Sequence, residues 1–163
     1  MNAHVILIVG TKGTGKTTKA KEIVSKVTDK PKFVYDINVE YSDSSILPDF
    51  QDFCEQMSEK DNSVILYEEA TIFLSASHTN REVNKQLVRS RHQNNLFVFV
   101  FHSLRTVPRW IMDFADYLIL FKTMDSAKNV ARKFEHPLID EAFEDIRVTS
   151  KSDIHYSRTL YLK

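Results

Sequence analysis

One nine-residue segment near the start of the chain limits its fold more than any other. Residues 10–18 read GTKGTGKTT, which fits the pattern G-x4-G-K-[ST] of a phosphate-binding loop. All three glycines of the 163-residue chain lie in this segment, so it differs from a generic flexible loop. An apolar run, His4–Val9, precedes it, and a stretch rich in Lys, Ala and Glu, Thr18–Val27, follows it. The sequence therefore predicts a buried strand, a tight loop and a helix in that order.

A loop of this kind is suited to binding phosphate groups. Backbone N–H groups and the positive end of the helix dipole both favour an anion at the start of a helix. Lys16 is expected to reach the β- and γ-phosphates of a nucleotide, and the Thr17 hydroxyl is expected to bind Mg²⁺. We therefore predict ATP and Mg²⁺ as cofactors, and a nucleotide-binding set of Gly10, Thr11, Lys12, Gly13, Thr14, Gly15, Lys16, Thr17 and Thr18.

Length and composition favour one soluble globular domain. Hydrophobic residues make up 42% of the chain and charged residues 27%. We expect a single domain over residues 1–163, with a core at 4–121 and a C-terminal extension at 122–163. The one cysteine, Cys54, excludes an internal disulfide and suits a reducing compartment. No apolar run is long enough to span a bilayer, and the first run lacks a basic region before it, so we expect neither membrane insertion nor a signal peptide.

The remaining patterns alternate between strand and helix. Strands are expected at His4–Val9, Lys32–Tyr35, Ser63–Tyr67, Leu96–Phe101 and Asp116–Phe121. Helices are expected at Gly15–Val27, Asp49–Lys60, Asn80–Gln93, Pro108–Asp113 and Ser126–Phe134, with an acidic loop at Asp36–Pro48 and a helical turn within 68–79. The rest is expected to be less regular, with a strand near its end because apolar residues alternate from Ile154 to Leu162. The alternation predicts an α/β fold: a parallel sheet with helices on both faces and ligands at the carboxyl ends of its strands.

Two acidic residues follow the third expected strand. The apolar run Val64–Tyr67 leads directly into Glu68 and Glu69, which is the Walker B pattern of an apolar strand that closes on paired acids. In such a pair, the first acid positions Mg²⁺ and the second polarises the attacking water. Glu68 is therefore a predicted Mg²⁺ ligand beside Thr17, and Glu69 is the predicted general base. The alternative is a solvated pair of acids at a strand end.

A single polar residue, His102, follows the fourth expected strand. Such a side chain can touch the γ-phosphate or the attacking water and so act as a sensor, or it can be a satisfied capping residue. Because no His or Cys lies at metal-ligand spacing from it, we do not expect His102 to bind a metal.

Charge is distributed unevenly although the formal net charge is zero. Residues 80–109 carry six cations and one acid, a local charge of +5, whereas residues 36–61 carry eight acids and one Lys, a local charge of −7. One interpretation is a ring interface, in which an arginine of one subunit, with Arg89 and Arg91 as candidates, enters the ATP site of the next. A second is contact with DNA phosphates, and a third is an ordinary solvated helix surface.

With these residues placed, the chain resembles the FtsK/HerA branch of the additional-strand P-loop NTPases, which have a RecA-like core. The branch contains DNA translocases, viral genome-packaging ATPases and phage assembly proteins of the zonular-occludens-toxin type. The residues that carry the resemblance lie between residues 4 and 121: the loop at 10–18, Glu68–Ala70, the basic segment Val88–Gln93, and His102. The resemblance implies a sheet of about five strands in the order 5-1-4-3-2, and a hexameric or pentameric ring on DNA. Glu68 stands where the branch has Asp, and His102 where many members have Gln.

Three functions follow from these patterns. The first is an ATP-hydrolysing DNA-translocating motor; the resemblance and the compact chain favour a viral genome-packaging ATPase, located in the host cytoplasm or the virion, with DNA and a capsid portal or vertex protein as partners. The second is a small-molecule kinase in which Asp36, after the second strand, binds an acceptor hydroxyl. The third is a nucleotide-switched phage or pilus assembly protein with little turnover.

Overall fold

The computed structural model describes residues 4–38, 49–75 and 77–163, so most of the expected acidic loop lies outside the described residues. The described strands are β1 Val5–Val9, β2 Lys32–Tyr35, β3 Val64–Tyr67, β4 Leu96–Phe101, β5 Tyr117–Phe121 and β6 Ser157–Tyr161. The described helices are α1 Lys16–Lys26, α2 Phe50–Met57, α3 Ala70–Phe73, α4 Arg81–Arg89, the 3₁₀ helix η1 Leu104–Thr106, α5 Arg109–Met112, α6 Ala127–Lys133 and α7 Pro137–Thr149.

The strands form one sheet in the order β2-β3-β4-β1-β5-β6. Strands β1 to β5 are parallel and, taken from β5, follow the order 5-1-4-3-2, as the resemblance implied. The sixth strand is an addition at the edge beside β5, where it runs antiparallel and places Ser157 opposite Phe121. This register brings the C-terminal part of the chain to the sheet edge at which β5 ends.

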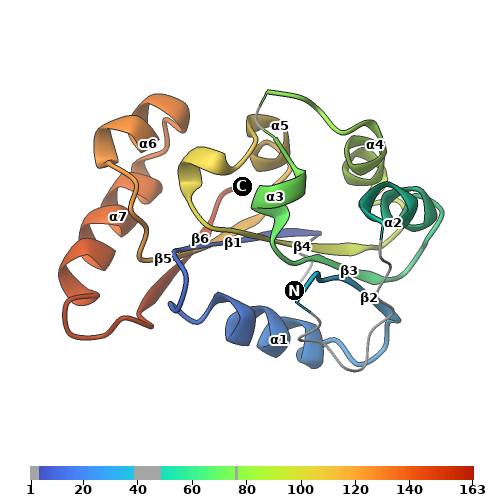
Figure 1. Ribbon diagram of the computed structural model, residues 1–163, viewed down its shortest axis with the longest axis horizontal. Coiled ribbons are helices and arrows are strands. Elements are labelled where there is room, and N and C mark those ends of the chain that lie inside the picture. Colours follow the sequence, from blue (N-terminus) through green and yellow to red (C-terminus); the bar gives the residue numbers. More distant parts are fainter. Residues whose placement is uncertain (1–3, 39–48, 76) are drawn as a thin grey trace.

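Each face of the sheet has its own hydrophobic core, and helices cover both faces (Figure 1). Alternate residues of β4 point to opposite faces, as in any strand: Phe97, Phe99 and Phe101 join one core, and Leu96, Val98 and Val100 join the other. Helix α1 packs on the second face through Ala20 and Val24. The other helices contribute to the first core, which is the larger one and holds the phenylalanines of β4. The predicted α/β architecture is therefore confirmed.

Two parts of the sequence-based prediction need correction. The segment after residue 134 was expected to be irregular, but α7 is the longest helix of the described chain. It starts with Pro137 at its first turn, ends with Arg147 in its last turn, and buries Ile139, Ala142 and Ile146 at helical spacing. Helix α4 also ends four residues earlier than the expected Gln93. The chain leaves the helix because residues 90–94 form a tight turn that precedes β4.

Candidate functional site

The phosphate-binding loop starts from the middle of the sheet. The Gly10 N–H donates to the Phe101 carbonyl at 3.1 Å, and the Thr11 N–H donates to the Lys122 carbonyl at 2.8 Å. The loop is thus held by both neighbours of β1, at the carboxyl ends of β4 and β5. A Cβ atom at Gly10 would lie 2.6 Å from the Phe121 Cβ, a separation that the two strands cannot accommodate without moving. Glycine is therefore required there by the close approach of the strands.

Two further glycines allow the loop to turn into α1. Gly13 and Gly15 have φ values of 81° and 97°, in the left-handed region that favours glycine. Gly15 is the residue before α1 and has no side chain to cap the helix. The N–H groups of the first turn of α1 are consequently available to an anion, and the helix dipole favours negative charge at the same place. This is the geometry that the sequence predicted for the loop.

Lys16 folds back over this loop. Its Nζ donates to the Thr11 carbonyl at 2.9 Å, and the residue is 7% exposed. Burial lowers the pKa of the Lys16 ammonium below its usual value, although the nearby charges of Glu69 and Glu68 act in the opposite direction. A cation with so little water around it interacts strongly with a bound phosphate, because little solvent is present to screen the attraction.

Thr17 and Glu68 lie together below the loop. The Thr17 hydroxyl donates to Glu68 Oε1 at 2.9 Å, and Glu68 is 2% exposed. Hydroxyl and carboxylate oxygens are ligands that suit Mg²⁺, so the pair fits the predicted metal role. Among the described residues, no group of three or more His, Cys, Asp and Glu side chains could hold a metal ion. A Mg²⁺ ion at this pair would therefore take its other ligands from nucleotide phosphates and water, as is common for Mg²⁺.

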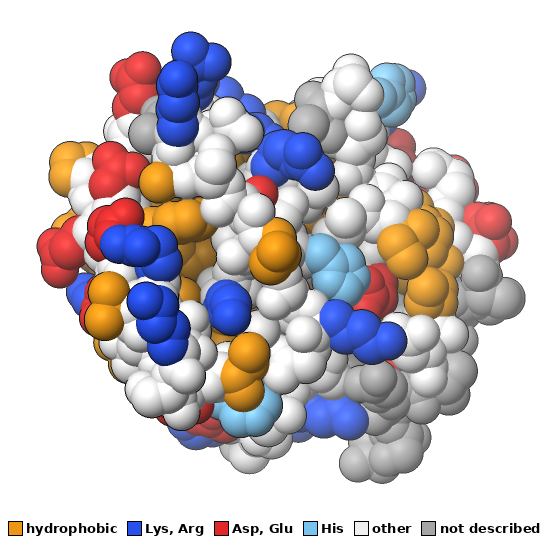
Figure 2. All heavy atoms as spheres, turned by 60° about the vertical axis from the view of Figure 1, so that its left-hand side comes forward, with side chains coloured by type: hydrophobic (Ala, Val, Ile, Leu, Met, Phe, Trp, Pro, Cys, Tyr) orange, Lys and Arg blue, Asp and Glu red, His pale blue; other side chains and the backbone are white. Residues whose placement is uncertain are grey.

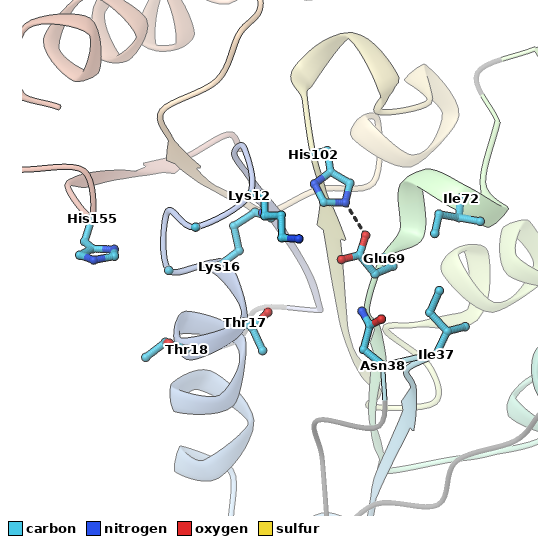
Figure 3. Close-up of a pocket in the computed structure, with 12 residues that line it drawn as sticks. Lys12, Lys16, Thr17, Thr18, Ile37, Asn38, Glu69, Ile72, His102 and His155 are labelled. Atoms are coloured by element: carbon cyan, nitrogen blue, oxygen red, sulfur yellow. Dashed lines mark hydrogen bonds and ion pairs between the residues drawn. The ribbon is translucent and has the colours of Figure 1, made fainter. Parts of the chain in front are cut away.

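Glu69 and His102 form the opposite wall of the site. Glu69 has a φ of 56° and precedes α3, so the chain turns sharply between the two acids. Its carboxylate makes a hydrogen bond with His102 Nε2. The His102 backbone N–H donates to the Thr71 hydroxyl at 2.9 Å, which links α3, the helix after β3, to the tip of β4. In Figure 3, Glu69 and His102 face Lys16 and Lys12 across the cavity.

These walls enclose a cavity of about 730 Å³, within the range of small-molecule binding sites. It is lined by Lys12, Gly13, Gly15, Lys16, Thr17, Thr18, Ile37, Asn38, Glu69, Ile72, His102 and His155. Sequence reasoning missed Ile37, Asn38, Ile72 and His155, as well as Thr71 behind His102. The loop motif gives no signal for them, because they come from segments that only the tertiary fold brings to the cavity.

Arg89 and Arg91 do not reach the cavity of their own chain. Both are exposed, and Arg91 lies 4.0 Å from Asp116, which precedes β5 at the amino end of the sheet. The loop lies at the opposite, carboxyl end. A role for either arginine in ATP hydrolysis, which remains a prediction, would therefore have to be played in the site of a neighbouring subunit.

The family of the chain can be assigned from its sequence. The pattern of the ATPase family associated with various cellular activities (AAA) matches residues 6–103, which is more than half of the chain. The chain belongs to the AAA family of ATPases. The match begins in β1 and ends just after His102, so this AAA segment includes the loop, both acids and the tip of β4. None of the curated proteins resembles the chain closely enough in sequence to count as a match.

Solved structures with the same fold come from viruses and bacteria. The genome packaging NTPase B204 from Sulfolobus turreted icosahedral virus 2, in complex with ATP-gammaS, has a TM-score of 0.78 at 16% identity, over 98% of this chain and 92% of that one. B204, the DNA-packaging ATPase from Sulfolobus Turreted Icosahedral Virus, has a TM-score of 0.79 at 17% identity, over 99% and 94%. The N-terminal domain of zonular occludens toxin from Neisseria meningitidis has a TM-score of 0.58 at 19% identity, over 75% and 78%. At these identities the likeness shows a shared fold.

No helix in the described part of this AAA chain combines the length and the apolar character that crossing a bilayer requires.

Proposed function

We propose that this AAA protein is an ATP-hydrolysing motor that moves DNA, and that the DNA is a viral genome during packaging. The observation that carries the hydrolysis is the arrangement of Glu69, held by His102, across the cavity from Lys16. The assignment to genome packaging is supported by the likeness to the B204 packaging NTPases over nearly the full length of both chains. The two parts of the proposal are tested separately below.

The chain would hold ATP through its loop. The N–H groups at the start of α1 bind the phosphates, and Lys16 exchanges its bond to the Thr11 carbonyl for the β- and γ-phosphate oxygens. Thr17 and Glu68 would hold Mg²⁺, which neutralises charge on the β- and γ-phosphates when it is bound. These contacts position the γ-phosphate toward the wall that carries Glu69.

Glu69 would act on the attacking water. As the water oxygen bonds to the γ-phosphorus, Glu69 accepts a proton, and the bond from that phosphorus to the bridging oxygen breaks to give ADP and phosphate. His102 fixes the carboxylate through its hydrogen bond, and Thr71 fixes the His102 backbone. The left-handed conformation of Glu69 directs its side chain into the cavity rather than along the strand.

The DNA-binding part of the proposal is supported by exposed cations. The six basic residues of the 80–109 segment come from separate elements, α4, the turn after it, η1 and α5, and all are exposed: Arg81, Lys85, Arg89, Arg91, Arg105 and Arg109. Figure 2 shows basic side chains among acidic ones on the face on which α6 and α7 come forward. Scattered cations of this kind suit contact with phosphates without recognition of sequence. We further propose a ring of subunits, with a portal or vertex protein as the capsid partner.

The kinase alternative has less support. Asp36, the residue expected to bind an acceptor hydroxyl, is 1% exposed, and its Oδ1 accepts the Asn38 N–H at 2.8 Å. It is also absent from the lining of the cavity among the described residues. A buried carboxylate engaged in its own turn is poorly placed to bind a second substrate.

Steady-state ATPase assays with and without double-stranded DNA test the proposal. We expect phosphate release without any added acceptor, stimulation by DNA that weakens as salt rises, and a loss of about 10²-fold or more in kcat for Glu69→Gln. Glu144→Gln, an exposed acid on α7, serves as the matched control and should leave kcat unchanged. Unaltered turnover in Glu69→Gln would refute the assignment of Glu69 as the general base. A monomeric protein whose turnover does not respond to DNA would count against the motor.

Slow turnover that Glu69→Gln leaves unchanged, together with tight ATP binding, would favour the nucleotide-switched assembly protein instead.

A further inference from the structure

The nucleotide cavity is closed at one end by a residue from outside the AAA match. His155 lies in the turn between α7 and β6, about 50 residues beyond the matched segment, yet it lines the cavity. Its Nδ1 would lie 3.3 Å from a Cβ atom built on Gly15, so the imidazole is next to the last glycine of the loop. Figure 3 shows His155 on the side of the loop opposite to Glu69, with Thr18 nearer to it than Thr17 is.

The position of His155 is fixed by the segments on either side of it. After it, β6 pairs with β5, and before it, Asp153 accepts the His155 N–H at 2.9 Å. Tyr156 and Arg158 both bond to Asp145 Oδ2 of α7, at 2.7 and 2.5 Å. Within the described part of the chain, no hydrogen bond engages the imidazole itself, and the residue is exposed. The backbone is therefore held in place while the ring remains available to a ligand.

The direction in which a nucleotide would lie in the cavity indicates which part of it the His155 ring would contact. Lys16 and Glu69 define the γ-phosphate end of the cavity, and the N–H groups at the start of α1 hold the phosphates nearer to the nucleoside. A nucleoside triphosphate bound in this direction leaves the loop past Thr18. His155 borders that exit, so its ring lies beside the nucleoside and away from the reacting phosphate.

We propose that His155 is a nucleotide-binding residue that packs against the nucleoside part of the bound ATP or ADP. The inference rests on the proposed function, because it takes the cavity to be an ATP site. It adds that the C-terminal segment, through α7 and β6, supplies one wall of that site. The imidazole takes part in holding the substrate and has no role in the transfer of the γ-phosphate.

Calorimetric titration with two ligands tests this assignment. ADP carries the nucleoside, whereas inorganic tripolyphosphate carries only the phosphate chain. We expect His155→Ala to weaken ADP binding roughly tenfold, as loss of one aromatic contact to a nucleoside does, and to leave tripolyphosphate binding unchanged. In ATPase assays the same variant should raise KM by a similar factor and keep kcat. His92→Ala, an exposed histidine in the turn after α4, is the matched control and should leave both constants unchanged.

Two results would overturn the inference. One is ADP binding by His155→Ala equal to that of the unaltered protein. The other is an equal loss for ADP and tripolyphosphate, which would show that the substitution disturbs the loop rather than a nucleoside contact. Thermal unfolding without ligand verifies that the variant folds, and we expect no change because the side chain is exposed. If the unaltered protein binds neither ligand, the ATP site itself is wrong and the proposed function fails, which is a distinct result.

Discussion

A buried hydrogen-bonded chain beneath the Walker B acids provides a quantitative prediction for stability. The Tyr67 hydroxyl donates to Gln86 Oε1 at 2.6 Å, and Gln86 Nε2 donates to the Cys54 carbonyl at 2.7 Å. Tyr67 and Gln86 are both fully buried, and burial raises the pKa of the phenol well above its usual value, so it remains a neutral donor. Tyr67→Phe removes the hydroxyl and retains the ring, which stacks on Phe99 at 4.9 Å.

The expected magnitude follows from what the substitution leaves behind. Gln86 Oε1 would be buried without a donor, and a buried polar group left unsatisfied costs about 1–3 kcal/mol. For a chain of this length, each kcal/mol corresponds to roughly 2–4 °C in the melting temperature. Replacing Gln86 by Leu in the same chain removes the orphaned acceptor, while the Cys54 carbonyl retains the Ser58 N–H as a partner at 3.1 Å. We therefore expect Tyr67→Phe/Gln86→Leu to be less destabilised than the sum of the two single variants.

Urea unfolding of the four proteins in a double-mutant cycle measures this coupling. The slope of unfolding free energy against urea should not change, because the surface buried on folding stays the same. The kcat for ATP should also stay unchanged, since Glu68 and Glu69 retain their backbone support. A Tyr67→Phe variant as stable as the unaltered protein, or strictly additive single substitutions, would refute the argument that this chain of bonds stabilises the core.

Two further predictions concern the ends of β1. Burial tends to raise the pKa of Asp116, but bonds from the His4 and Val5 N–H groups and from Lys163 outweigh it, so the folded pKa is lowered. The carboxylate then stabilises the fold above about pH 4, and this stabilisation is lost as the pH falls through the lowered pKa. In urea unfolding between pH 7 and pH 3, the free energy of unfolding should therefore fall less for Asp116→Asn than for the unaltered protein. At the other end, Gly10→Ala should lower the free energy of unfolding by about 1–3 kcal/mol through overpacking, and it should weaken ADP binding in calorimetry. Unchanged ADP binding would show that the strands can move apart without disturbing the loop.

Local signals predicted most of the fold. The bounds of β2 and β4 match the expected strands, because each is a short β-rich run with turn residues on both sides. Helix α7 was missed even though its signals are present in the sequence, namely Pro137 at its start and apolar residues at helical spacing. The partner and direction of β6 could not be predicted, since an alternating pattern states which face is buried and says nothing about which edge is paired.

The parts of the candidate site that lie close together in the sequence could be predicted, whereas the parts that are brought together by the fold could not. The loop residues and the acids after β3 follow motifs with fixed spacing, and the structure places Lys16, Thr17, Glu68, Glu69 and His102 together. The bond between Glu69 and His102 depends on the parallel register of β3 and β4, which no spacing encodes. The position of His155 depends on the antiparallel pairing of β6 with β5, which lies beyond the motif region. Its proximity to Gly15 is therefore a property of the tertiary structure alone.

Because β1 lies in the middle of the sheet, the site can form only after strands that are synthesised later. The ribosome produces the phosphate-binding loop before β4 and β5, yet β1 lies between these two strands in the described sheet, and their last residues paired with it are Phe101 and Leu120. Until those strands have been synthesised, the loop lacks the carbonyls that hold Gly10 and Thr11. Pairing strands that are distant in sequence costs loop-closure entropy before the stabilising contacts form. This slows folding and leaves apolar strands exposed in the meantime. The loop thus becomes competent for ligand only after synthesis has reached Lys122, and a nascent chain has no nucleotide to stabilise it before then.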